Sequence, residues 1–120
     1  MTRPILIVTI TLLAAFFSSC SKEARLKEEI IGTWVSIDYI DTLDFISDEI
    51  FEKNFYDGLM HPYTYEIKRD SIKIQYSGYY DILTKATTHH LEILDDKLSI
   101  DFSIGTYGMR QQEVLYNRID

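Results

Sequence analysis

Apolar and polar residues alternate along most of the chain after residue 32, as expected for strands with one buried face. In one such run Ile72, Ile74 and Tyr76 share one side, and Lys73 and Gln75 share the other. Turn residues separate eight runs of this kind. We therefore expect eight strands, at residues 33–39, 42–46, 49–56, 63–69, 71–76, 89–94, 97–102 and 112–119.

The connections between these runs are short, and three of them suit tight hairpins. Asp57-Gly58, Arg69-Asp70 and Asp95-Asp96 supply residues that tolerate the positive φ such turns require. Successive strands should therefore be antiparallel neighbours. Eight strands with one buried face remove their exposed edges most simply by closing, so the predicted fold class is all-β, an eight-stranded antiparallel up-and-down barrel.

The side chains expected inside this barrel are nearly all bulky. An eight-stranded barrel is just wide enough for side chains to fill, so we expect a small or partly filled cavity rather than a wide cup. The outward positions are polar, which is the reverse of a membrane-spanning porin. The inward candidates are Trp34, Phe45, Tyr65, Ile67, Ile72, Ile74, Tyr76, Leu91, Ile93, Leu98, Ile100, Phe102, Val114 and Tyr116.

Residues 47–58 fit two structures. Ser47 before two acidic residues, with Gly58 at the end, could mark a capped helix that would act as a lid over the interior. The alternation of Phe51, Lys53 and Phe55 with polar neighbours favours a strand that leads into a hairpin instead.

The start of the chain has the pattern of a bacterial lipoprotein signal. The only cysteine, Cys20, follows an apolar run (5–17) and the small pair Ser18-Ser19. As a helix that run would span roughly 20 Å, too short to cross a bilayer. We expect a signal peptide at 1–19 and acyl chains such as palmitate on Cys20; an ordinary secretory signal or a buried strand is the alternative.

Residues 20–31 should form the lipidated tether and a short helix. Ser21 can cap its start, Leu26 and Ile30 share one face, and Gly32 ends it. A solvated tether without structure is the other possibility. The remaining residues, 32–120, have the length of one domain and form the barrel.

The charge of the chain excludes some partners. Removing 1–19 takes one of the 12 basic residues away, so 11 remain against 19 acidic residues and the net charge is −8. Such a protein repels nucleic acid and anionic membrane surfaces. Membrane attachment must therefore come from the lipid on Cys20.

Both ends of the barrel segment carry a pattern that resembles the lipocalins. Gly32-Thr33-Trp34 opens the first strand, and Arg118 lies in the last. In that family the tryptophan of G-x-W closes one end of the barrel and an arginine of the last strand packs across it, a cation–π contact of roughly 0.5–2 kcal/mol. The resemblance implies a structural bracket of Gly32, Trp34 and Arg118.

With the lipoprotein signal, the chain is similar to small lipocalin-like lipoproteins of Gram-negative bacteria. The lipocalin T-D-Y motif, a disulfide and a C-terminal helix are missing, which bears on ligand specificity more than on the barrel. In such lipoproteins an aspartate directly after the lipidated cysteine commonly retains the protein at the inner membrane. Ser21 follows Cys20 here, so the resemblance implies localisation to the outer membrane.

Other candidate chemistry is weak. His90 and Glu92 share one face of a predicted strand, and an imidazole with a carboxylate can bind zinc. His61 could add a third metal ligand. Alternation, however, puts His90 and Glu92 on the solvent face. Asp41 with Asp44, and Asp95-Asp96, fall where polar turns are expected. We expect no metal, no cofactor and no enzymatic activity, since no nucleophile motif or phosphate loop is present.

Two functions remain open. The first is binding of a small apolar or amphipathic ligand in or at the mouth of the barrel, by residues drawn from Phe51, Phe55, Tyr65, Tyr76, Tyr79, Tyr80, Tyr107 and Met109. The second is a protein-interaction module, an envelope inhibitor or complex subunit, whose barrel is solid and whose loops contact another protein.

Overall fold

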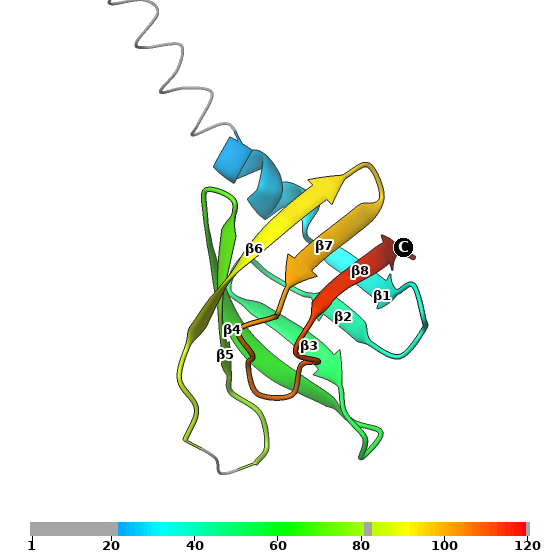
Figure 1. Ribbon diagram of the computed structural model, residues 1–120, viewed down its shortest axis with the longest axis vertical. Coiled ribbons are helices and arrows are strands. Elements are labelled where there is room, and N and C mark those ends of the chain that lie inside the picture. Colours follow the sequence, from blue (N-terminus) through cyan, green and yellow to red (C-terminus); the bar gives the residue numbers. More distant parts are fainter. Residues whose placement is uncertain (1–21, 81–82, 120) are drawn as a thin grey trace, which may run out of the picture.

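The computed structural model describes residues 22–80 and 83–119, so the predictions for the leader and Cys20 lie outside the described residues. Within these ranges eight antiparallel strands close into a barrel in the order of the sequence, and one short helix (22–29) precedes them (Figure 1). The strands are β1 (Gly32–Ser36), β2 (Thr42–Phe45), β3 (Ile50–Asn54), β4 (Met60–Lys68), β5 (Ser71–Tyr76), β6 (Thr87–Leu94), β7 (Lys97–Asp101) and β8 (Glu113–Arg118). The predicted fold class is confirmed.

Segment 47–58 contains strand β3 and no helix. The Ser47 hydroxyl accepts the backbone N–H groups of Glu49 and Ile50 at 3.3 and 3.2 Å, so it caps a tight turn between β2 and β3. The same side chain that signals a helix start therefore serves a hairpin. The preferred prediction, a strand, is confirmed.

Strand boundaries differ from the prediction at one end of the barrel. β1 stops at Ser36 because Tyr39 takes a φ of 63° and the chain turns there. β4 begins at Met60 and runs through Pro62, whose carbonyl accepts the Ser77 N–H at 3.0 Å. A proline near a strand end removes only one backbone N–H donor from the sheet, so the strand can continue through it.

The barrel interior is packed with side chains along its length. Every inward candidate is buried, and the core also takes in Leu43, Phe51 and Tyr63. Aromatic rings stack along the axis: Phe51 lies 4.8 Å from Phe45 and 4.9 Å from Tyr63, measured between ring centroids. Side chains therefore fill the barrel, which we call solid. The sequence predicts a small or partly filled cavity, and the interior lies at the filled end of that range.

Helix 22–29 closes one end of the barrel. Its apolar face buries Leu26, and Ile30 follows it into the core. The indole N–H of Trp34 donates to the Ile30 carbonyl at 2.8 Å. The Arg118 guanidinium lies 4.2 Å from the Trp34 ring centroid and donates to the Ile31 and Glu29 carbonyls. The predicted contact between first and last strand is present, and the two residues face each other in the β1–β8 register.

The helix end carries the shortest hairpins. Arg69 and Asp95 occupy the turns with φ values of 55° and 56°. The backbone N–H of Arg69 donates to the Glu23 carboxylate at 3.2 Å, which ties the β4–β5 turn to the helix. In the part of the chain that is described, no helix has the length and apolar character needed to span a bilayer.

Candidate functional site

The four longer connections gather at the end of the barrel opposite the helix, here called the mouth (Figure 1). They are the loops at 37–41, 55–59 and 102–112 and the connection from β5 to β6, of which the structure describes 77–80 and 83–86. The 102–112 loop is the longest, and it folds back across the open end of the barrel. The Tyr63 hydroxyl, which points up from the core, donates to the Tyr107 carbonyl at 2.7 Å. Burial raises the pKa of Tyr63 far above its ordinary value, so this hydroxyl keeps its proton.

Gly108 lets the 102–112 loop lie close to the rings of Tyr63 and Phe55. Its φ is +80°, and a Cβ at this position would stand 2.2 Å from the Tyr63 hydroxyl oxygen and 2.7 Å from Phe55 Cζ. A side chain here would therefore be strained and would collide with the aromatic rings beneath the loop.

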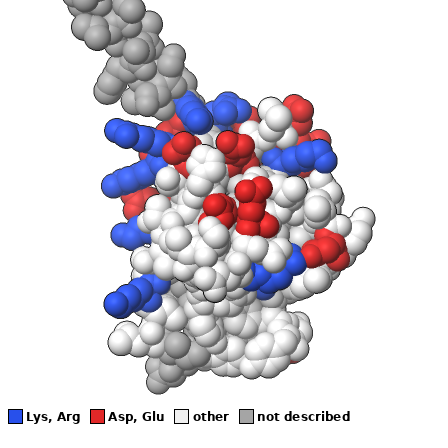
Figure 2. Space-filling model, in the orientation of Figure 1, with Lys and Arg blue, Asp and Glu red and all other residues white. Residues whose placement is uncertain are grey.

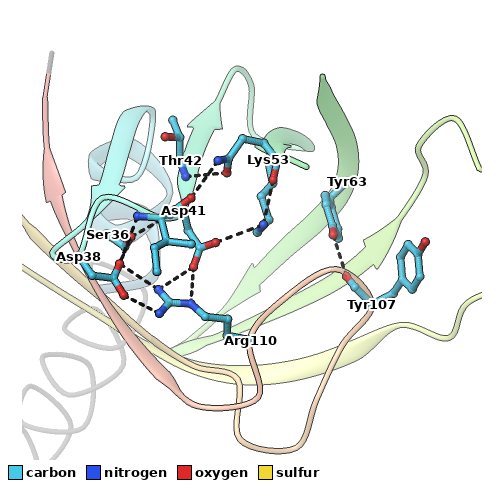
Figure 3. Close-up of polar contacts among 10 residues, drawn as sticks. Ser36, Asp38, Asp41, Thr42, Lys53, Tyr63, Tyr107 and Arg110 are labelled. Atoms are coloured by element: carbon cyan, nitrogen blue, oxygen red, sulfur yellow. Dashed lines mark hydrogen bonds and ion pairs between the residues drawn. The ribbon is translucent and has the colours of Figure 1, made fainter. Parts of the chain in front are cut away.

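A network of charged groups, buried at Asp41 and Lys53, fixes one side of the mouth (Figure 3). Asp41 is buried between two cations: Lys53 Nζ lies 3.3 Å from its Oδ1, and Arg110 Nε donates to its Oδ2 at 2.8 Å. Arg110 also donates to Asp38 at 2.6 Å. Its guanidinium, with the Ser36 hydroxyl, holds the pKa of Asp38 well below the usual range. The network joins three elements: the β1–β2 loop, β3 and the 102–112 loop.

The sequence pattern does not reveal this network. Asp41 falls in a predicted polar turn and Lys53 has no predicted partner, although Lys53 lies between Phe51 and Phe55 on the inward side of β3. A lysine at an inward position needs a buried anion, and this was the available signal. Nothing in the alternation indicates that Arg110, 69 residues from Asp41 along the chain, completes the site.

A second polar cluster, around His61, lies on the other side of the mouth. His61 is buried against the Phe55 ring, with centroids 4.0 Å apart. Its Nε2 lies 2.8 Å from Asp57 and its Nδ1 lies 2.7 Å from the Tyr76 hydroxyl. The Tyr80 hydroxyl donates to Asp57 at 2.6 Å.

The protonation of the His61 cluster follows from Asp57. The Tyr80 hydrogen bond, the Leu59 N–H and His61 lower the pKa of Asp57 to about 2. An ionised carboxylate only accepts, so Nε2 carries a proton and, in the neutral ring, Nδ1 accepts from Tyr76. The Tyr76 oxygen in turn accepts the Tyr80 N–H at 3.2 Å. These groups satisfy one another's hydrogen bonds and hold Tyr80, at the start of the connection from β5 to β6, against the barrel.

Between the loops lies a cleft of 480 Å³, here called the mouth cleft. Aromatic rings and apolar side chains form its walls, and the Asp41–Lys53 pair lies at its base. The lining residues are Ile40, Asp41, Lys53, Asn54, Phe55, Tyr56, Tyr107 and Gly108. Mostly apolar walls with a few fixed polar groups are the usual build of a small-molecule site, and this volume is within the usual range.

The predicted ligand-binding residues separate into three groups. Phe55 and Tyr107 line the mouth cleft. Tyr79, Tyr80 and Met109 also lie at the mouth: Tyr79 is exposed beside His61, and the other two pack against the core. Phe51, Tyr65 and Tyr76 are buried inside the barrel, so packing and internal hydrogen bonds account for their positions.

His90 and Glu92 lie on the outer face of β6, as the alternation predicts, with His90 Nε2 3.2 Å from Glu92 Oε1. His61 belongs to the mouth cluster and does not join them. Among residues 22–80 and 83–119, no group of three or more His, Cys, Asp or Glu side chains is arranged to hold a metal ion.

The chain matches no protein-family model, and none of the curated proteins or solved structures compared with it matches either. The lipocalin-like resemblance therefore stays a prediction, and the geometry of the mouth is the basis for a function.

Proposed function

We propose that this protein binds a small amphipathic molecule in the mouth cleft. The cleft itself carries the proposal, because it offers apolar walls over a polar base at the one end of the barrel that the helix leaves open. The solid interior supports the same location, since a ligand cannot enter between Trp34, Phe51 and Tyr63 without displacing packed side chains.

The base of the cleft defines the polar part of the ligand. An ammonium group has three N–H donors, and the contacts of Lys53 with Asp41 and the Asn54 carbonyl use two of them. The third can meet an oxygen of the ligand. Because Asp38 and Asp41 offset Lys53 and Arg110 in charge, a neutral or zwitterionic head group with an accepting oxygen fits best.

The walls define the apolar part. Phe55, Tyr56 and Tyr107 line the cleft, and aromatic rings pack well against flat rings or aliphatic chains. The ligand class is therefore a small molecule with an apolar body and one polar head.

Native mass spectrometry of the protein purified from its own cell envelope tests this proposal. We expect a bound small molecule on the wild type. Tyr56→Ala should reduce its occupancy at least tenfold, because Tyr56 lines the cleft yet is almost fully exposed and supports little of the fold. Tyr39→Ala is the matched control, since Tyr39 is similarly exposed but does not line the cleft. Bare protein in every sample would contradict the proposal.

We also propose that Cys20 carries a lipid and holds the barrel at the outer membrane, as a lipocalin-like lipoprotein. The support is the sequence pattern of residues 1–20. Cells fed an alkyne-tagged palmitate should label the wild-type chain and not Cys20→Ser, and the variant should leave the membrane fraction. Equal labelling of both chains would contradict the anchor.

A further inference from the structure

The mouth carries a ring of exposed apolar side chains on all four of its loops. Tyr39 is 85% exposed and Tyr56 is 92% exposed, and the other members are each more than half exposed. We call this set the loop-end surface: Tyr39, Ile40, Tyr56, Leu59, Tyr79, Leu83 and Ile104. Among the described residues, Ile46, Leu94 and Ile119 are also more than half exposed and lie toward the helix end, but the other apolar side chains exposed to this degree are all on these four loops. Such a concentration at one end differs from the single, scattered apolar residues of an ordinary surface.

Charged side chains are few on these loops: in their described parts they are Asp38, Asp41, Asp57, Lys85 and Arg110. On the face that Figure 2 shows, Lys, Arg, Asp and Glu gather toward the helix end, and the opposite end is almost free of them. Two carboxylates near the loops are already engaged: Asp38 with Arg110, and Asp57 with Tyr80 and His61. The loop-end surface could therefore be covered without burying these carboxylates unpaired.

The size of the surface suits a protein interface. A tyrosine offers about 150–250 Å², so the three exposed tyrosines alone provide on the order of 500 Å². Four aliphatic side chains add to this. A stable protein interface buries roughly 800 Å² on each partner, with tyrosine enriched and charge depleted at its centre. The loop-end surface matches both the area and the composition.

The position of the surface selects the occupant, given the proposed anchor. Helix 22–29 begins two residues after Cys20 and is docked at the far end of the barrel by Leu26 and Ile30. The loop-end surface thus faces away from the membrane that holds the lipid. Two copies joined mouth to mouth would direct their anchors in opposite directions, so both could not sit in one membrane.

We propose that the loop-end surface docks onto a second, different protein of the cell envelope. The loops project outward, so the partner's contact surface is hollow and apolar. It also lacks an excess of acidic groups, because the mature chain has a net charge of −8 and would repel them.

Photo-crosslinking in cells of the source organism tests the proposal on the full chain. p-Benzoylphenylalanine replaces Tyr39, Leu59 or Ile104, and Glu66 and Lys73, exposed on the barrel wall, serve as control positions. We expect one and the same protein, identified by mass spectrometry, to be joined at all three loop positions and at neither wall position. With the crosslinker at 104, Tyr39→Asp with Leu59→Asp should lower the adduct at least tenfold.

Each other outcome overturns the inference. An adduct of twice the chain's mass would mean that a second copy covers the surface, and an adduct with lipid alone would mean a membrane. Equal crosslinking at the wall, or none at the loops, would mean that the loop-end surface is no interface. The melting temperature of the double variant shows that it is folded.

Failure of the anchor or of ligand binding gives different results. Loss of bound small molecule in the wild type concerns the ligand proposal alone. Loss of the palmitate label removes the argument from anchor position against a second copy, and the mass of the crosslinked adduct then decides between a second copy and a different protein. Tyr39→Asp with Leu59→Asp changes residues outside the mouth cleft, so the variant should keep its ligand while it loses the partner.

Discussion

Trp34 and Arg118 lie opposite each other where the first and last strands meet, and each supports the other. The indole is fully buried and donates to the chain just before β1, while the guanidinium covers its ring and holds two carbonyls of the helix end. Two residues therefore join the first strand, the last strand and the helix.

Trp34→Ala should lower the free energy of unfolding by about 3–5 kcal/mol, because it empties a large buried site. Arg118→Ala should cost less, and the two losses should be non-additive, with a coupling of roughly 0.5–2 kcal/mol from the cation–π contact. A double-mutant cycle in urea measures this. Strictly additive losses would mean that the two side chains act independently.

His89 makes stability depend on pH. It is buried inside the barrel, its Nδ1 donates to the Asp101 carbonyl at 3.1 Å, and its Nε2 lies 2.7 Å from the Thr87 hydroxyl. Burial lowers the pKa of His89 below 6.5, so the folded protein keeps the ring neutral where the unfolded chain takes up a proton.

The contribution of His89 is therefore complete above about pH 6.5 and is lost as the pH falls toward its folded pKa, by up to about 1.4 kcal/mol per pH unit. Urea unfolding between about pH 7.5 and pH 5 should show this slope, and His89→Gln should flatten it. His90→Gln, on the outer face, should retain the wild-type slope. Identical slopes for wild type and His89→Gln would contradict the assignment.

At the scale of elements, the 102–112 loop is held to the barrel by polar contacts and by close packing. Arg110 joins it to Asp41 and Asp38, and Tyr107 accepts from Tyr63. The loop forms one wall of the mouth cleft, so these contacts also fix the shape of the site.

Asp41→Ala should cost about 3–5 kcal/mol, because it leaves Lys53 buried without its carboxylate. Asp41→Ala combined with Lys53→Met should recover much of that loss, since a neutral pair needs no counter-charge. Chemical denaturation gives the energies, and amide exchange in 102–112 reports whether the loop detaches. No recovery in the double variant would mean that Lys53 is not the group left uncompensated.

Gly108 and Gly58 form a matched pair, with φ values of +80° and +81°. Gly58→Ala meets nothing within 4 Å, so backbone strain alone should cost about 1 kcal/mol. Gly108→Ala adds a collision with Tyr63 and Phe55, so it should cost more and should lower ligand occupancy in native mass spectrometry. Equal losses for the two variants would show that the loop is not in close contact with the mouth.

At the scale of the whole molecule, the alternation of residues determines the barrel and its solidity. Ile72, Ile74 and Tyr76 point inward as their spacing requires, and bulky inward residues on all strands leave little space. Alternation assigns each residue a face but no partner across the barrel. For that reason the sequence indicates Phe55 and Tyr107 as mouth residues, yet misses the Asp41–Lys53–Arg110 network.

The same limit explains the predicted ligand residues that turned out to be internal. Phe51, Tyr65 and Tyr76 have the residue type of a binding site and the periodicity of a core. Their depth along the axis depends on strand register and on how the loops fold back, and both are set by contacts between distant segments.

NMR spectroscopy with a small-molecule extract of the cell envelope tests the central claim most directly, namely that this solid barrel binds only at its mouth. We predict shifts of the amide signals of Phe55, Tyr56, Tyr107 and Gly108, and none for the indole N–H of Trp34 at the helix end. No shifts at the mouth, or a shifted Trp34 indole, would contradict the account.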